Sequence, residues 1–346
     1  MQFALQGFST EQFFYGLYPG MFYGGFGFLR REDAIATRRM RGGNVFGIYP
    51  FDRFRRVELS AGVFNSRETF NDPNLRAQSE SFQLREFGTT LFQDGTYMPL
   101  GVRYVQETTV LREFGPVSGN TVMLGYTYAP GAGGLLSRQT VDVDARYYLR
   151  LAESGVLAFR ARAFRSWGEF PDFTFFGGNS EMRGYDYLEF LGHKSIYANA
   201  ELRFPLIEAM LTPIGVLGGI RGTFFFNFGV AGLAGQPLRI WNRDPVTVRP
   251  VVNYVGDPDT QSIRPILGDP VNVSGFRLDN ARASYGIGLT TYAIGFPIHF
   301  DWSWLTLFNR AWEDAVFAYA ATRRGVVRGS DAFRRVRFQM WIGYDF

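Results

Sequence analysis

Cysteine is absent from the 346 residues of this chain, so disulfides, zinc–thiolate sites and a cysteine nucleophile are excluded. There are two histidines, His193 and His299, which leave little for a metal centre or a histidine-based proton relay. No stretch approaches the roughly 18 continuous apolar residues of a membrane-spanning helix. The first residues lack the basic start and apolar core of a signal peptide. We therefore expect either that a signal peptide has been removed or that residues precede Met1.

Aromatic residues and glycine are over-used, with 36 Phe, 18 Tyr and 41 Gly. Strands favour aromatic side chains, and glycine serves tight turns and close strand packing, so the two enrichments together indicate many short strands. The 36 basic and 32 acidic residues are spread along the chain and give a net charge of +4, without the basic patch of a nucleic-acid-binding protein. We expect no nucleic-acid partner, no metal and no cofactor.

Apolar and polar residues alternate in several segments, a period of two that is typical of strands with two different faces. These segments are 140–150, 156–167, 195–204, 220–230, 298–304 and 336–346. Their polar faces carry charges of both signs, as in a hydrated lumen, and their apolar faces carry aromatic residues near the strand ends, as in interfacial girdles. A soluble sandwich would have a wet outer face and an apolar inner one. The pattern favours an antiparallel transmembrane β-barrel, an all-β fold.

The connections between these strands alternate in length. Short links fall at 152–155 and 293–296. Long segments, all on the opposite side, are 166–193, 232–280 and 308–333. Outer-membrane barrels have this asymmetry, with short periplasmic turns and long extracellular loops. The link 205–216 is of middle length on the short side, and we expect a helical turn there and another within 310–324.

The first half of the chain has a weaker pattern. Candidate strands lie near 2–8, 20–30, 43–49, 54–65, 78–90, 97–113 and 120–130. Residues 49–54, YPFDRF, predict a tight turn between two of these strands. Together with seven strands in the second half, the count is about fourteen. No linker marks a second domain, so we expect a single barrel domain over 1–346.

One stretch, residues 173–206 (FTFFGGNSEMRGYDYLEFLGHKSIYANAELRFPL), carries a specific motif. Paired glycines, Gly177 and Gly178, precede the tripeptide Arg183–Gly184–Tyr185, and a strand ending in Glu-Leu-Arg-Phe-Pro-Leu follows. An arginine in a partly dehydrated lumen is costly unless its planar guanidinium meets a carboxylate. Gly184 would permit a sharp turn, and Tyr185 would pack with its hydroxyl bonded. The spacing alone also fits an ordinary solvated loop arginine.

With this motif, the chain from about residue 140 to its end, and more loosely the first half, resembles the BamA-like outer-membrane assembly and secretion superfamily, also called the bacterial surface antigen family. The resemblance implies a bacterial outer-membrane barrel of nominally sixteen strands. The shortfall from sixteen leaves two explanations open: either the division of the first half into strands is wrong, or the first strands and any periplasmic domains lie upstream of Met1. The resemblance also implies that the motif loop folds into the lumen, where Arg183 contacts acidic residues on the next two strands. Glu201 matches the first acidic position. Asn227 stands where the family often has aspartate, so we expect Arg183 to rest mainly on Glu201.

The chain ends on an aromatic residue within its most regular strand. The residues that share the apolar face are Phe338, Met340, Ile342, Tyr344 and Phe346. Only Trp341 breaks the alternation, and we expect the apolar face to contact lipid. This terminal strand resembles the signal by which the assembly machinery recognises barrel clients.

Other candidate residues have simpler explanations. His193 and His299 lie far apart in sequence, and we expect structural or surface roles for both. His299 shares the polar face with Asp301, which predicts at most a hydrogen bond. Asp142 and Asp144 lie on an arginine-rich face, which predicts lumenal ion pairs. The chain has no nucleophile elbow, phosphate-binding loop or dinucleotide fingerprint, so we expect no enzymatic activity.

The resemblance implies a device that inserts or translocates outer-membrane proteins. Its partners would be outer-membrane lipid, client proteins and periplasmic domains or partner proteins. An alternative is a structural barrel that anchors a periplasmic or extracellular module, or a partner complex, without transport. A passive porin is the third hypothesis. The genuine N-terminus would separate the first two, and large, steady bilayer conductance would support the third.

Overall fold

The computed structural model describes residues 1–15, 35–70, 73–87, 90, 92–112, 115–151, 155–187, 189–212, 215–257, 262–293, 296–318 and 330–343. Its main feature is one antiparallel sheet of 14 strands. The twelve principal strands, in order along the sheet, are β1 (Gln2–Tyr15), β2 (Ile35–Pro50), β3 (Arg55–Phe70), β5 (Leu100–Glu107), β7 (Gly115–Ala129), β8 (Arg138–Arg150), β9 (Val156–Trp167), β12 (Lys194–Thr212), β13 (Gly215–Gly232), β20 (Arg282–Ala293), β21 (Phe296–Thr306) and β22 (Arg337–Ile342). Two short strands, β4 (Gly95–Tyr97) and β6 (Val110–Arg112), pair with β3 and β7.

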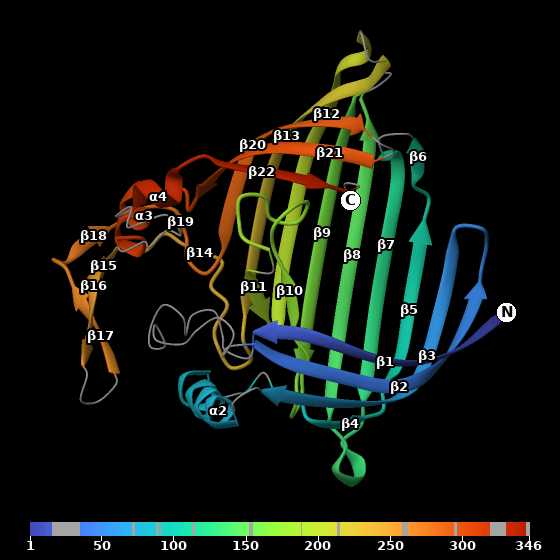
Figure 1. The fold of residues 1–346 in the computed structure, drawn as a ribbon, viewed down its shortest axis with the longest axis horizontal. Coiled ribbons are helices and arrows are strands. Elements are labelled where there is room, and N and C mark those ends of the chain that lie inside the picture. Colours follow the sequence, from blue (N-terminus) through green and yellow to red (C-terminus); the bar gives the residue numbers. More distant parts are fainter. Residues whose placement is uncertain are drawn as a thin grey trace.

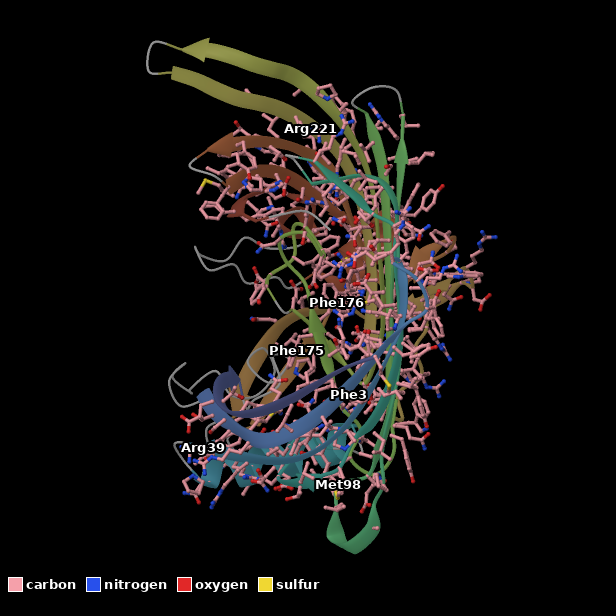
Figure 2. The ribbon with its side chains drawn as sticks, turned by 90° about the vertical axis from the view of Figure 1, so that its right-hand side faces the viewer. Phe3, Arg39, Met98, Phe175, Phe176 and Arg221 are labelled. Carbon is pink, nitrogen blue, oxygen red and sulfur yellow. The ribbon has the colours of Figure 1, made fainter. Side chains whose placement is uncertain are left out.

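The sheet curls strongly, as a transmembrane barrel wall does. Figure 1 shows β1–β3 and β20–β22 turning back across the wall formed by β7–β9, and Figure 2 shows both groups on the same side of that wall. We call the concave side of the sheet the inner face and the convex side the outer face. Strands β1 and β22 form the two ends of the sheet. Among the described residues, no helix has the length and apolar character needed to cross a membrane.

The alternating segments form strands with two distinct faces, as predicted. On β21 the inner residues His299, Asp301 and Ser303 are 2%, 3% and 0% exposed. On β13 the outer residue Phe224 is 53% exposed and its inner neighbour Phe225 is 4% exposed. Because side chains alternate along each strand, the register between strands gathers all inner residues into one polar wall.

The predicted connections are largely confirmed. The YPFDRF turn joins β2 to β3, and the Asp52 carboxylate accepts hydrogen bonds from the backbone N–H groups of Phe54 and Arg55 at 2.7 and 2.8 Å. A short link closed by a Leu151–Gly155 backbone hydrogen bond joins β8 to β9. The long connections leave β9, β13 and β21 at the other end of the wall. Within the last of them, α3 (Arg310–Val316) confirms a helix in the first part of 310–324; residues 319–324 lie outside the described residues.

The predicted helical turn at 205–216 is wrong. Strands β12 and β13 instead stay paired up to Thr212 and Gly215, with one register shift after Pro205. Each strand supplies the backbone hydrogen-bond partners of the other, which a single helical turn would not achieve. Neighbouring strands pair only as far as Arg203 on one side and Ile220 on the other. The hairpin therefore projects beyond the rest of the wall, past Arg221 (Figure 2).

The first half departs most from the prediction. The candidate strand at 78–90 is wrong, because residues 73–87 form the helix α2 (Pro73–Phe87). Pro73 stands at its first position, where proline favours helix initiation, and the following residues are mostly good helix formers. The candidate at 20–30 lies outside the described residues. The predicted count of about fourteen strands equals the number in the main sheet, but only when the short strands β4 and β6 are counted. The sixteen strands implied by the resemblance are not reached within the described residues.

The long connections carry their own structure. The connection 168–193 forms a small hairpin of β10 (Thr174–Phe176) and β11 (Phe190–Gly192) inside the curve of the sheet (Figure 1). The connection 233–281 forms a ribbon of β14 (Trp241–Asn242) with β19 (Arg277–Leu278), β15 (Val246–Val248) with β18 (Val271–Val273), and β16 (Val251–Asp257) with β17 (Ser262–Leu267). The connection after β21 contains α3 and α4 (Ser330–Arg334). One hydrophobic core joins all three, since Met182, Leu278 and Phe333 belong to it.

Candidate functional site

Arg183 lies on the turn between β10 and β11 and is 1% exposed. Its Nη1 donates to Glu201 Oε1 on β12 at 2.5 Å, and its Nε donates to Asp301 Oδ2 on β21 at 3.1 Å. Its guanidinium also lies over the Phe225 ring of β13, with 4.6 Å between Cζ and the ring centroid. One loop cation thus contacts three strands of the inner wall, β12, β13 and β21, through charge-assisted and cation–π interactions.

Arg203 completes a buried four-charge cluster with Arg183, Glu201 and Asp301. Its Nε and Nη2 lie 2.8 and 2.7 Å from Glu201 Oε2, so the two arginines occupy different oxygens of one carboxylate. The side chains of the ion pairs are at most 4% exposed, and two positive charges balance two negative charges. Because buried ions lose their hydration, such a cluster is stable only while every member keeps its partner.

The backbone of the motif is bound by the last strand. Gly184 N donates to Gln339 Oε1 at 2.8 Å, and Arg337 Nη1 donates to Gly184 O at 2.7 Å. Gly184 has φ +88°, and a Cβ there would lie 2.9 Å from Ser303 Cβ. Only glycine satisfies both the conformation and the close approach to β21. The motif therefore sits directly against the strands that end the sheet.

Tyr185 anchors the other end of the tripeptide in the hydrophobic core. Its side chain is 3% exposed, and its hydroxyl donates to Ala283 O on β20 at 3.2 Å. Burial raises the pKa of the Tyr185 hydroxyl, so that the group remains a hydrogen-bond donor. With Arg183 and Gly184, the tripeptide connects β12, β13, β20, β21 and β22, which are consecutive along the sheet.

The glycine pair shapes the turn that presents Arg183. Gly177 N donates to Glu181 Oε2 at 3.0 Å, and Glu181 N donates to Gly178 O at 3.0 Å. Gly177 has φ +134°, and a Cβ would meet Asp186 O at 2.8 Å. A side chain at this position would therefore both strain the backbone and displace the turn.

The expectation that Arg183 rests mainly on Glu201 needs correction. The second carboxylate is Asp301, which is distant in sequence but faces Arg183 across the curved sheet. Asn227 faces inward as predicted, but its side chain accepts from Asn199 at 2.8 Å and donates to Ser284 Oγ at 3.1 Å. Within the described residues Asn227 links three inner strands and does not serve as the second partner of Arg183.

Asp301 also explains why Trp341 interrupts the terminal alternation. Trp341 faces inward and its Nε1 donates to Asp301 Oδ2 at 2.7 Å. Its ring stacks on His299 with 3.8 Å between centroids. The His299 ring in turn lies 3.0 Å from Thr290 Oγ1 and 2.8 Å from Gly343 O. An aromatic residue therefore occupies a polar-face position because its indole N–H completes the charge cluster.

The outer face of β22 carries the residues of the predicted C-terminal signal. Phe338, Met340 and Ile342 are 57%, 61% and 61% exposed. Tyr344 and Phe346 lie outside the described residues. Recognition of this strand by assembly machinery stays a prediction.

A second ion cluster lies on the wall itself. The Asp144 carboxylate accepts two hydrogen bonds from Arg146 and two from Arg160, with both Nη2–Oδ2 distances at 2.8 Å. Arg162 Nε lies 3.3 Å from Asp142 Oδ1. Asp142 and Asp144 therefore form inner-face ion pairs, as their arginine-rich surroundings predicted.

His193 is buried between β11 and β12. Its Nδ1 accepts the backbone N–H of Ala234 at 2.9 Å, and burial lowers the pKa of the imidazole to about 4. The ring is therefore neutral at physiological pH and holds two loop segments together. In the part of the chain that the structure describes, no cluster of three or more histidine or acidic residues has a metal-binding arrangement.

The fold and the site define a class: an antiparallel transmembrane β-barrel with a loop held inside it by a buried arginine. Residues 106–346 match the Omp85 superfamily domain, and the chain belongs to this superfamily. No curated protein matches the sequence.

Many solved structures are similar to the chain, among them the following two. One is BamA from Haemophilus ducreyi lacking POTRA domains 1–3, with a TM-score of 0.53 and 12% identity, covering 91% of this chain and 56% of that one. The other is CdiB from Acinetobacter baumannii, with a TM-score of 0.43 and 13% identity, covering 80% and 40%. At this identity the BamA likeness shows the fold alone. The chain spans only about half the length of these structures, 56% and 40% respectively.

Proposed function

We propose that this barrel takes part in inserting or translocating proteins at the bacterial outer membrane, with the 168–193 connection as its internal lock. The observation that carries the proposal is the arginine cluster, in which Arg183 joins Glu201 of β12 and Asp301 of β21 on the inner face of the sheet. Family membership over residues 106–346 supports the same class of function. No chemical step is involved, so the protein acts by binding and positioning.

The lock acts on the strands that end the sheet. Glu201 is on β12, whereas Gln339 and Arg337, which bind the motif backbone, are on β22. A loop bound to both fixes the position of the last strand relative to the wall. A barrel that handles other proteins needs a defined terminal strand, because an unpaired strand edge otherwise associates without specificity.

The partners in this proposal are outer-membrane lipid, client outer-membrane proteins and periplasmic domains or partner proteins. The chain spans only 56% of the BamA structure. The client and partner proteins are therefore part of the proposal. Phe338, Met340 and Ile342 present the apolar strand by which the barrel itself would be recognised during its own assembly.

Reconstitution tests the proposal. The protein purified from outer membranes is placed in liposomes, an unfolded outer-membrane protein is added, and its folded, protease-resistant fraction is followed over time. Liposomes with the protein should fold the client faster than empty liposomes, and Arg183→Ala should abolish the gain. Arg249→Ala, an exposed arginine on the ribbon, is the matched control and should retain it. Equal rates with and without the protein would overturn the proposal.

One observation favours a second candidate, a structural anchor. The three long connections share a single hydrophobic core, which makes a firm platform for an extracellular module. An anchor would leave client folding unchanged while a partner complex dissociates when the platform is loosened, for example by Phe333→Ala. A passive porin would instead give large, steady conductance in planar bilayers, and the loop inside the curve predicts a small, flickering one.

A further inference from the structure

Four aromatic side chains form a continuous exposed group where the 233–281 ribbon leaves the barrel. Trp241, Phe276, Phe308 and Phe226 are 56%, 39%, 48% and 38% exposed, and we call them the outer aromatic patch. Phe276 lies 6.1 Å from both Trp241 and Phe308, and Phe308 lies 6.2 Å from Phe226, measured between ring centroids. Such a contiguous exposed group of large apolar side chains marks an interaction surface.

The patch continues the lipid-facing side of the barrel. Phe226 is an outer-face residue of β13, and its partner on β20 is Tyr285, which stacks on Trp304 of β21. Further along β13, the outer-face residue Val230 is 0% exposed and belongs to the core against which Leu238 and Ile240 pack. The start of the ribbon therefore folds over the outer face of the wall. Aromatic belts on the outer face of a barrel are typical of the boundary between acyl chains and headgroups.

A single arginine provides the polar half of the surface. The Arg243 guanidinium lies over Trp241 at 5.5 Å and over Phe276 at 5.7 Å, and the residue is exposed. Within the described ranges, no carboxylate lies within ion-pair distance of Arg243. The guanidinium is thus exposed and lies against two aromatic rings, an arrangement that suits it to bind a phosphate. A basic residue beside aromatic side chains at a membrane boundary favours an anionic headgroup.

Phe308 shows that the patch has a structural cost. Its φ is +60°, a left-handed conformation that is unfavourable for a bulky side chain. Its backbone N–H is held by Thr306 Oγ1 at 2.9 Å, and its ring is half exposed, so core packing does not account for the strain. What the conformation does achieve is contact between this ring and both Phe226 and Phe276. Strained residues of this kind concentrate at binding sites.

We propose that the outer aromatic patch and Arg243 bind a phosphate-bearing lipid of the outer leaflet. The rings contact the acyl and glycerol or sugar portion, and the guanidinium binds the phosphate. The ribbon is thereby held against the membrane surface beside the barrel, on the outer side of β13 and β20.

Native mass spectrometry of the detergent-purified protein tests the proposal. The probes are lipid A with its phosphates and the same lipid A after dephosphorylation. The wild type should retain the phosphorylated lipid, and Arg243→Ala should lower retention roughly fivefold, as expected for one basic residue near an anionic lipid. Arg249→Ala, also on the ribbon but outside the patch, should retain the lipid. Equal retention by the two variants, or equal binding of the dephosphorylated lipid, would overturn the proposal.

A second variant separates binding from folding. Phe308→Asn places a residue that tolerates positive φ at this position while removing the ring. It should stay as heat-resistant on gels as the wild type and yet lose lipid A. An unchanged lipid count in a folded Phe308→Asn protein would contradict the role of the patch. Inorganic phosphate alone should not displace bound lipid; displacement at millimolar phosphate would show that the site recognises free anions and would reject the lipid.

Discussion

Two clusters on the inner wall use the same chemistry for different ends. In one, Arg183 joins Glu201 and Asp301, and Arg203 shares Glu201. In the other, Arg146 and Arg160 both bind Asp144. The first cluster connects a loop to the wall, and each of its side chains is at most 4% exposed. The members of the second cluster all belong to two neighbouring strands, and Arg146 is 30% exposed. The two clusters therefore have similar hydrogen-bond geometry but differ in burial, chiefly at Arg146.

The two clusters differ in how much their ion pairs are needed to hold the chain in place. The strands that carry Asp144 and Arg160 are already held by their backbone ladder, so the ion pairs add little to their placement. The 168–193 connection has no long ladder of its own, since β10 and β11 share three residue pairs. Its position therefore depends largely on side-chain contacts, among them those of the tripeptide Arg183–Gly184–Tyr185.

Arg183→Ala should have the largest effect. It leaves two buried carboxylates with fewer positive partners, and breaking such a pair costs about 3–5 kcal/mol. We expect protease cleavage within 168–193 and earlier loss of heat-resistant migration on gels. Arg53→Ala, in the exposed turn between β2 and β3, should show neither change. A loop that stays protected in the Arg183 variant would contradict its role as anchor.

The two carboxylates should differ in a defined order. Glu201→Gln should cost more free energy of unfolding than Asp301→Asn, because two arginines bind Glu201. Each loss should be roughly 1–3 kcal/mol or more, the cost of an unpaired buried charged group. Unfolding by urea in detergent measures both. The reverse order would mean that Trp341 and Arg183 together make Asp301 the principal anchor.

Acid should weaken the barrel through His193. Its folded pKa of about 4 lies below the unfolded value of 6.5, so the unfolded state binds more protons as pH falls. Stability is therefore full above pH 6.5 and is lost progressively down to pH 4, by about 2 kcal/mol at pH 5. Comparison of unfolding at pH 7.5 and pH 5 should show this loss in the wild type and a smaller one in His193→Asn. An equal loss in both proteins would assign the pH dependence to other groups.

Arg146→Ala should have the smallest effect. Asp144 keeps Arg160, and a partly exposed pair contributes no more than about 1 kcal/mol. Unfolding curves should nearly overlay those of the wild type. A loss as large as that of Arg183→Ala would remove the distinction between the two clusters.

The sequence predicted those features of the fold that depend on local periodicity, namely the strands and the face on which each side chain lies. Because side chains alternate along a strand, the inward orientation of Glu201, Asn227 and Asp301 followed from parity alone. The partnership of Arg183 with Asp301 did not, since 118 residues separate them and only the curvature of the sheet brings them together. Trp341 is the instructive case. Its departure from the alternation was visible, but the indole hydrogen bond that explains it depends on a neighbouring strand.

Other differences have local causes. The length and position of the link 205–216 predict a helical turn, yet β12 continues through Pro205 to Thr212 and its pairing with β13 resumes after one register shift. Residues 73–87 contain no Val, Ile or Thr and consist mostly of good helix formers, so their composition favours the helix over the candidate strand at 78–90.

A double-mutant cycle tests the central claim most directly. The free energy of unfolding is measured in detergent for the wild type, Arg183→Ala, Glu201→Ala and the double variant, and the cycle is repeated with Asp301→Ala. The loop lock predicts coupling of roughly 0.5–3 kcal/mol in both cycles, because each pair is in direct contact. Additive changes in both cycles would contradict it.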